Sequence, residues 1–159
     1  MSGSRVPALI DWLVNAFTTA PTLGQATPPV TIYDGPPTTG LDAPLKLYVG
    51  LTDPDNLGIE AAATFRQSRA DLGSATRTEL PDIFCCAEAW AGTDDLATVR
   101  HAVAAIVAAA ETVIRADATN FGGLGQATPG LASGDLLQNN TAQGAFARIP
   151  FVVSFTSFT

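Results

Sequence analysis

The chain has 159 residues, a length that suits one domain with a sizeable core. Hydrophobic residues make up 47% of it and charged residues only 14%, which excludes an intrinsically disordered chain. The formal net charge is −7 with Lys46 as the single lysine, which argues against nucleic-acid binding through a basic patch and against docking on an anionic membrane.

Targeting signals are not evident in the sequence. No apolar run reaches the roughly 18 residues of a membrane span. The N-terminus lacks the basic start and apolar core of a signal peptide. We therefore expect no membrane partner, and a chain that stays in the cytoplasm in which it is made.

The first half of the chain predicts one short helix and three strands. Apolar residues at helical spacing, with Pro7 at a first-turn position, predict a helix over residues 6–17. Strands are predicted over residues 30–33, 45–51 and 59–68. The second strand alternates cleanly, with one face formed by Leu45, Leu47, Val49 and Leu51 and the other by Lys46, Tyr48 and Gly50.

A long helix over residues 93–116 dominates the second half. Thr93 and Asp94 suit the helix N-cap, and Asp94 and Asp95 place negative charge at the positive end of the helix dipole. One apolar stripe faces a core, formed by Leu96, Val99, Val103, Ile106, Val107, Ala110, Val113 and Ile114. The opposite side is small and weakly polar, which favours a second partner there.

Strands are also predicted on either side of this helix. Residues 77–90 form a long strand in which Pro81 implies a bulge, an edge position or a break. Residues 117–130 form a Gly-rich connection, residues 131–139 suit a strand or an irregular arm, and residues 144–158 form the last strand. The hexapeptide LGQATP occurs twice in predicted loops, at residues 23–28 and 124–129.

This order predicts a single α+β domain over residues 1–159. We expect a mainly antiparallel β-sheet with a short N-terminal helix and one long helix packed on one face. The other sheet face has few charges, which favours contact with other chains. The expected subunit interface consists of Ala97, His101, Ala104 and Ala108 on the long helix and Tyr48 and Trp90 on the sheet.

Residues that could carry chemistry are few. His101 is the only histidine and lies on the side of the helix away from the core, where a plain surface or interface role is favoured over a catalytic one. The loop at residues 53–58 resembles a calcium loop, but Leu57 and Thr64 stand where ligands belong, so we interpret it as an ordinary turn whose acids face solvent or a partner. The Gly-rich residues 122–125 lack a following lysine.

Two further pairs of residues are interpreted as structural. Asp82 and Glu88 are six residues apart on a strand with a proline, and nothing suggests opposed pKa values. Cys85 and Cys86 are adjacent, so on a strand they point to opposite faces and are poorly placed to bond to each other. The sequence therefore predicts no catalytic, metal or cofactor site and a protein that is not an enzyme.

Three stretches resemble one known family. They are VPALIDWLVNAF followed by VTIYDGPP and LKLYVGL, then DIFCCAEAWAGTDDLATVRHAVAAIVAAAETVIRA, and finally QNNTAQGAFARIPFVVSFTSF. Their order and spacing are similar to those of the tail terminator proteins of long-tailed phages, in particular phages and prophages of actinobacteria. The likeness covers most of the chain. The residues that carry it determine the fold and are not residues that carry chemistry.

The resemblance implies a structural part of a virion. It implies a homohexameric ring that caps the head-proximal end of the tail tube, stops tube polymerisation and provides the surface that joins the head. The implied partners are the tail tube protein and a head-completion or connector protein, with assembly in the host cytoplasm and no cofactor. DNA would pass through the lumen without specific binding, for which a negative wall is suited.

Two alternatives remain open. The first stays within virion assembly, as a head-closure or connector protein or a tail tube subunit, although the Ala-rich helix leans away from a strand-dominated tube protein. The second is a small soluble binding domain or enzyme, which would show a concave pocket with convergent polar groups.

Overall fold

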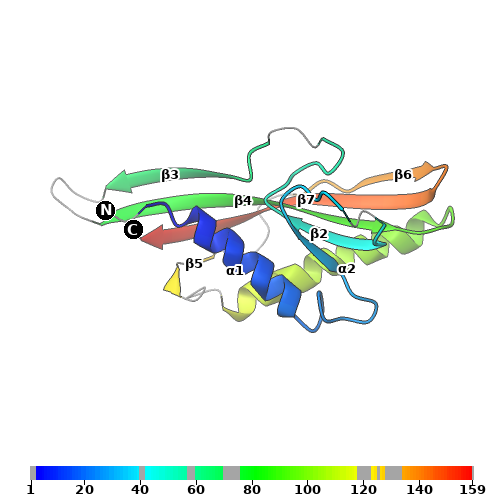
Figure 1. The fold of residues 1–159 in the computed structure, drawn as a ribbon, viewed down its shortest axis with the longest axis horizontal. Helices are drawn as coiled ribbons and strands as arrows, with labels where there is room; N and C mark the ends of the chain where they lie inside the picture. Colours follow the sequence, from blue (N-terminus) through cyan, green and yellow to red (C-terminus); the bar gives the residue numbers. More distant parts are fainter. Residues whose placement is uncertain are drawn as a thin grey trace.

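The computed structural model describes residues 3–39, 42–56, 60–69, 76–117, 123–124, 126–127 and 134–158. Two helices and seven strands follow one another in the order α1 (Val6–Thr19), β1 (Thr31–Asp34), β2 (Leu45–Val49), β3 (Ala63–Arg69), β4 (Arg77–Trp90), α2 (Leu96–Ala116), β5 (Gln126–Ala127), β6 (Leu137–Thr141) and β7 (Gly144–Phe158) (Figure 1). The predicted α+β class is confirmed.

The long antiparallel pair of β4 and β7 forms the centre of the sheet. β2 and β3 both pair with β4, along different parts of its length, and β5 and β6 likewise both pair with β7. β1 lies beside β2 as the parallel exception to an otherwise antiparallel arrangement. The strands from β2 to β7 are therefore joined by antiparallel pairing, as expected for a mainly antiparallel sheet.

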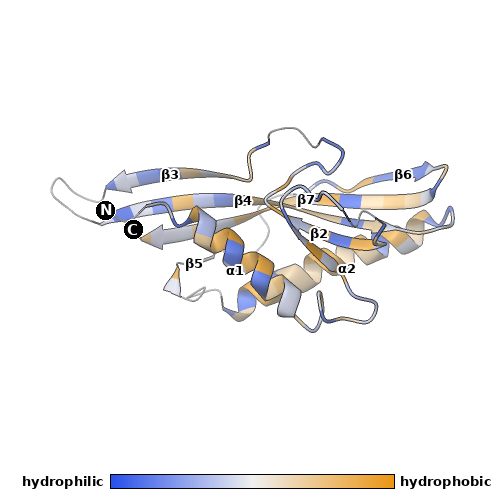
Figure 2. Cartoon of the chain, in the orientation of Figure 1, coloured by the Kyte–Doolittle hydropathy of each residue, from blue (hydrophilic) through white to orange (hydrophobic). Residues whose placement is uncertain are grey.

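Both helices contribute to one core on one face of the sheet (Figure 2). Leu9, Leu13 and Phe17 of α1 recur at i, i+4 and i+8 and are fully buried. The stripe predicted for α2 is buried as well, through Val99, Val103, Ile106, Ala110 and Ile114. We call this side of the sheet the helix face and the opposite side the outer face.

The start of α2 differs from the prediction. The helix begins at Leu96, and Asp95 is its N-cap, accepting a hydrogen bond from the backbone N–H of Thr98 at 3.1 Å and one from the Thr98 hydroxyl. These hydrogen bonds lower the pKa of Asp95. The predicted caps Thr93 and Asp94 are therefore wrong, because both lie before the N-cap. The backbone carbonyl of Thr93 accepts a hydrogen bond from the backbone N–H of Ala145, which ties the turn to β7.

Two strands differ in extent from the prediction. β3 begins at Ala63, later than expected, and β6 covers residues 137–141 of a region predicted as residues 131–139. Residues 57–59, 125 and 128–133 lie outside the described part of the chain, and these include half of the second LGQATP copy. The copy was predicted to lie in a loop, but its residues Gln126 and Ala127 form β5. In the first copy Leu23 is fully buried, and Gly24 lies so close to the Thr18 carbonyl that a Cβ would clash.

Pro81 lies inside a continuous β4, so it neither breaks the strand nor ends it. The backbone N–H of Phe84 donates a hydrogen bond to the carbonyl of Ala62, on the β3 side of β4. Because successive residues of a strand point their N–H groups to alternate sides, an N–H at position 81 would point toward β7. The register between β4 and β7 is interrupted there, between the pairs Glu79↔Ser157 and Asp82↔Ser154. The proline is tolerated because the ladder with β3 does not need its missing donor.

The sheet is strongly twisted along its length. Figure 1 shows that β4 lies above β7 at the end where β3 is, and below β7 at the end where β6 is. The outer face therefore turns toward opposite sides at the two ends. We call the end formed by β3, residues 77–82 and residues 154–158 the arm.

Candidate functional site

The residues predicted as an interface on the long helix lie together. Ala97, His101, Ala104 and Ala108 are all exposed on the side of α2 that points away from the sheet. This confirms their placement on one surface. That another chain covers this surface stays a prediction.

The two sheet residues of the predicted interface lie on the outer face, away from α2. Trp90 is half-buried and stacks on Phe146, with ring centroids 4.8 Å apart. Tyr48 is 1% exposed and stacks on Tyr33 at 5.0 Å. Listing Tyr48 as an accessible interface residue was therefore wrong, because its ring is covered by neighbours in its own chain.

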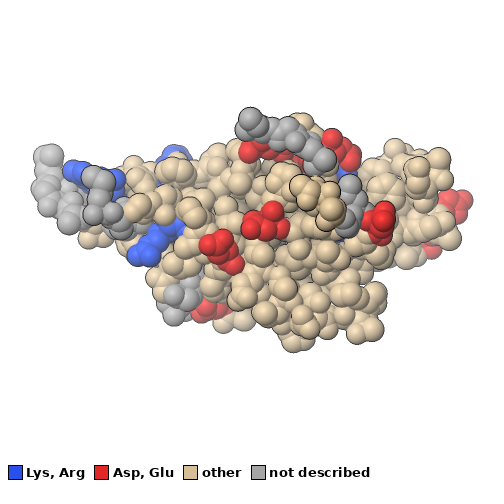
Figure 3. Space-filling model, viewed as in Figure 1, with Lys and Arg blue, Asp and Glu red and all other residues tan. Residues whose placement is uncertain are grey.

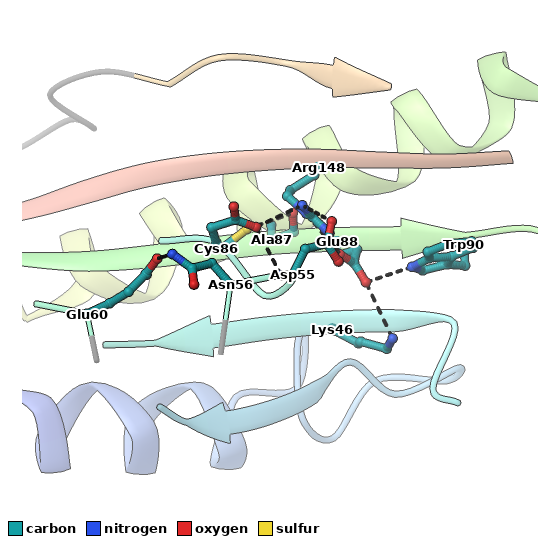
Figure 4. Close-up of polar contacts among 10 residues, drawn as sticks. Lys46, Asp55, Asn56, Glu60, Cys86, Ala87, Glu88, Trp90 and Arg148 are labelled. Carbon is teal, nitrogen blue, oxygen red and sulfur yellow. Dashed lines mark hydrogen bonds and ion pairs between the residues drawn. The ribbon is translucent and has the colours of Figure 1, made fainter. Parts of the chain in front are cut away.

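A cluster of buried charges occupies the outer face beside these aromatic rings (Figure 4). Glu88 is its centre, and its Oε1 accepts hydrogen bonds from Lys46 Nζ at 3.4 Å and Trp90 Nε1 at 2.6 Å. Its Oε2 accepts two hydrogen bonds from Arg148, from Nε at 2.9 Å and from Nη2 at 2.6 Å. The register explains the meeting, since Glu88 pairs with Lys46 on β2 and with Arg148 on β7.

The loop after β2 closes over Arg148. Nη1 of this arginine donates hydrogen bonds to Asp53 at 3.3 Å and to Asp55 at 3.0 Å. Burial lowers the pKa of Arg148, but the hydrogen bonds to Asp55 and Glu88 outweigh it and the pKa is raised. Both acids are exposed to solvent, as predicted, and they also hold their own loop onto the sheet.

An open pocket of about 410 Å³ lies next to this cluster. It is lined by the aromatic residues Tyr48 and Trp90, the buried charges of Lys46 and Glu88, and the acids Asp42 and Asp55. Its volume is within the range of small-molecule and side-chain binding pockets. The pocket is thus polar, partly aromatic and open to solvent.

The acids and bases of this site are occupied with one another. Both oxygens of Glu88 accept two hydrogen bonds each, so the carboxylate is not free to act as a general base. Burial, and then the nearby Glu88 charge, raise the pKa of Tyr48, so the phenol stays protonated at neutral pH. These contacts hold the strands and the loop together at this site, and none of the groups just described is an activated nucleophile.

Other predicted pairs are separated in the structure. Asp82 lies in the arm and accepts a hydrogen bond from Ser154 at 2.6 Å, away from Glu88 in its charge cluster. Cys85 is on the helix face and Cys86 on the outer face, and both are buried free thiols. Among the described residues, no group of three or more His, Cys, Asp and Glu side chains could hold a metal ion.

One helix in the described part of the chain, α2, is long and apolar enough to cross a membrane by length and composition. Core helices of soluble proteins pass the same test, and the apolar stripe of α2 packs on the sheet. The expectation of no membrane partner stays a prediction.

The arm carries a second notable surface. Its exposed large apolar side chains are Phe65 at 52%, Leu80 at 42% and Phe158 at 56%. Arg66 and Arg69 are exposed on the same strand as Phe65. Figure 3 shows Lys and Arg gathered mainly toward this end in that view and Asp and Glu over the rest.

Sequence reasoning missed the charge cluster. Lys46, Glu88 and Arg148 each fall on the non-core side of an alternating strand, which was a usable signal. Their meeting depends on strand register, which alternation alone does not determine.

Comparisons with known proteins add no relative. No protein-family model matches the chain, and no curated protein matches it significantly.

Proposed function

We propose that the protein is a structural virion component, a tail terminator that assembles into a homo-oligomeric ring at the head-proximal end of a phage tail tube. In this role the ring stops tube polymerisation and presents the surface that joins the head. The segment order of the sequence suggests this family, and the surfaces of the folded chain support self-association.

The observation that carries the proposal is the arm. On its outer face Leu80 and Phe158 are 42% and 56% exposed, and Phe65 is 52% exposed on its other face. Outside the arm, the exposed large apolar residues of the described chain are Leu136 and Leu137, next to and within β6. Exposed apolar surface of this kind marks contact sites between proteins. The twist turns the outer face of the arm and the outer face at the pocket to opposite sides, so the two surfaces of one chain suit head-to-tail contacts, which form a ring when the rotation between copies closes.

The exposed side of α2 supports the same proposal. Between Ala97 and Ala108 this side carries alanines together with Arg100 and His101 and has no acid. Small side chains allow close approach of a neighbouring subunit without ordering long flexible groups. A surface of small side chains on α2 therefore suits a contact that forms when subunits assemble.

The proposed partners follow from the role. They are further copies of this chain, six in the arrangement that the resemblance implies, the tail tube protein and a head-completion or connector protein. DNA passes through the lumen, and an overall charge of −7 disfavours its retention on the wall.

The test is the mass and shape of the recombinant protein. Light scattering should give a single ring-sized species, and negative-stain electron microscopy should show single rings. Rods would favour the tail tube alternative. A monomer at all concentrations would overturn the ring.

The pocket beside Trp90 favours one second candidate, a small binding domain. Convergent polar groups and two aromatic walls are features of such a site. Against it, Glu88 and Arg148 already satisfy one another. A monomeric mass together with thermal stabilisation by a small molecule, lost in Trp90→Ala, would favour this candidate over the ring.

A further inference from the structure

The pocket on the outer face has more negative than positive charge around it. Four carboxylates, those of Asp42, Asp53, Asp55 and Glu88, stand against the two cations of Lys46 and Arg148, which leaves an excess of two negative charges. Asp42 is exposed at the pocket wall. A cation placed there would offset this excess without breaking the internal ion pairs.

The wall of the pocket also suits a particular kind of cation. Trp90 is half-buried with its indole N–H already used by Glu88, so its ring remains as an apolar surface toward the pocket. A guanidinium group stacks on such rings and binds carboxylates through two parallel hydrogen bonds. The pocket therefore favours an arginine over a lysine.

The arm offers an arginine of this kind. Arg66 is exposed and, within the described residues, makes no hydrogen bond or ion pair. It pairs across the strands with Leu80, and Phe158 lies on the same face opposite Thr78. We call Arg66, Leu80 and Phe158 the arm patch: a cation beside the exposed Leu80, with the exposed Phe158 on the same face two strands away from Arg66.

We infer that the arm patch of one copy docks at the pocket of the next copy, with Arg66 beside Asp42 and Trp90. This inference rests on the proposed ring and names the contact that builds it. The arm patch and the pocket lie on the same sheet face at opposite ends of the twisted sheet, so they are turned to opposite sides. Each copy can then give its arm to one neighbour and receive an arm from the other.

The test uses reversed charges. Arg66→Asp and Asp42→Arg each place like charges in the contact, and each should weaken assembly about 10-fold or more by analytical ultracentrifugation. A 1:1 mixture of the two single variants should restore assembly, because copies that alternate around the ring meet only opposite charges. Restoration by mixing cannot come from a damaged fold.

Matched controls keep the result specific. Arg69→Asp makes the same charge change on the same strand but three residues away, on the other face of the arm, and Asp11→Arg makes the reverse change on α1. Both controls should assemble as the unmodified chain does. Circular dichroism should show that all four variants are folded.

The outcomes separate the inference from the proposed function. If the unmodified chain forms rings and the two pocket-and-arm variants form them equally well, the docking contact is wrong and the ring stands. If the variants fail alone and also fail when mixed, the contact is likewise wrong. If the unmodified chain never associates, both the ring and the contact are overturned.

Discussion

At the scale of single residues, Glu88 holds the outer face together. It is 3% exposed and is the shared partner of two buried cations, Lys46 and Arg148. Removing one member of a buried ion pair costs more than never having had the pair, because the remaining charge loses both water and partner. The cluster makes the fold sensitive to this one carboxylate.

We therefore expect Glu88→Gln to lower the free energy of unfolding by about 3–5 kcal/mol, measured by urea denaturation. The control is Glu111→Gln, which removes an i,i+4 ion pair with the exposed Arg115 and should cost no more than about 0.5 kcal/mol. Equal effects of the two substitutions would contradict the role given to Glu88.

The adjacent cysteines allow a chemical test at the same scale. Burial raises the pKa of Cys85 to about 12, opposed in part by a backbone hydrogen bond from Gly50, and burial also raises the pKa of Cys86. At pH 8 roughly one Cys85 side chain in 10⁴ is then a thiolate. The native protein should not react with a disulfide reagent at pH 8, and both thiols should react in denaturant.

The same shift has a consequence for stability at high pH. An unfolded thiol ionises near pH 9, whereas the folded Cys85 stays protonated until about pH 12. The contribution of Cys85 to the free energy of unfolding is fully present below pH 9 and is lost as the pH rises toward 12. Denaturation curves should thus show stability falling across this range, and a flat profile there would contradict the raised pKa.

At the scale of elements, α2 has two sides with different roles. Val103 is fully buried against the sheet, whereas Ala104, the next residue, is exposed. We expect Val103→Asp to cost about 3 kcal/mol or more in unfolding free energy, because it forces an unpaired charge into the core.

Ala104→Glu should change stability by only about 0.5 kcal/mol while reducing the assembled mass in light scattering. Unchanged assembly in this variant would remove α2 from the interface.

The predicted elements were most accurate where periodicity was strongest. The stripe of α2 and the alternation of β4 and β7 are confirmed because each pattern repeats over several turns or residue pairs. The alternation of β2 is confirmed as far as Val49, but Leu51 was wrongly placed: the strand ends at Val49, Gly50 has a positive φ of 78°, and Leu51 packs with Tyr48 and Cys86 on the outer face.

The ends of the elements were less accurate. Thr93 and Asp94 were expected as caps, and Asp95, which is equally suitable by residue type, caps the helix instead.

At the scale of the whole molecule, unlike charges at its two ends predict assembly that depends on salt. The Debye length falls from about 10 Å at 0.1 M ionic strength to about 3 Å at 1 M, which screens exposed pairs such as Arg66 and Asp42. Ring formation should weaken between these concentrations in sedimentation experiments. Assembly that strengthens with salt would instead indicate a contact dominated by the apolar side chains of the arm patch, Leu80 and Phe158.

The sequence by itself determined the α+β class, the core faces of the long elements and the opposite placement of Cys85 and Cys86, because each depends on local periodicity. Only the tertiary structure decided that Lys46, Glu88 and Arg148 meet, that Tyr48 is covered, and that the outer face points to opposite sides at the arm and the pocket. These features depend on strand register and sheet twist, which arise from contacts between residues far apart in the chain.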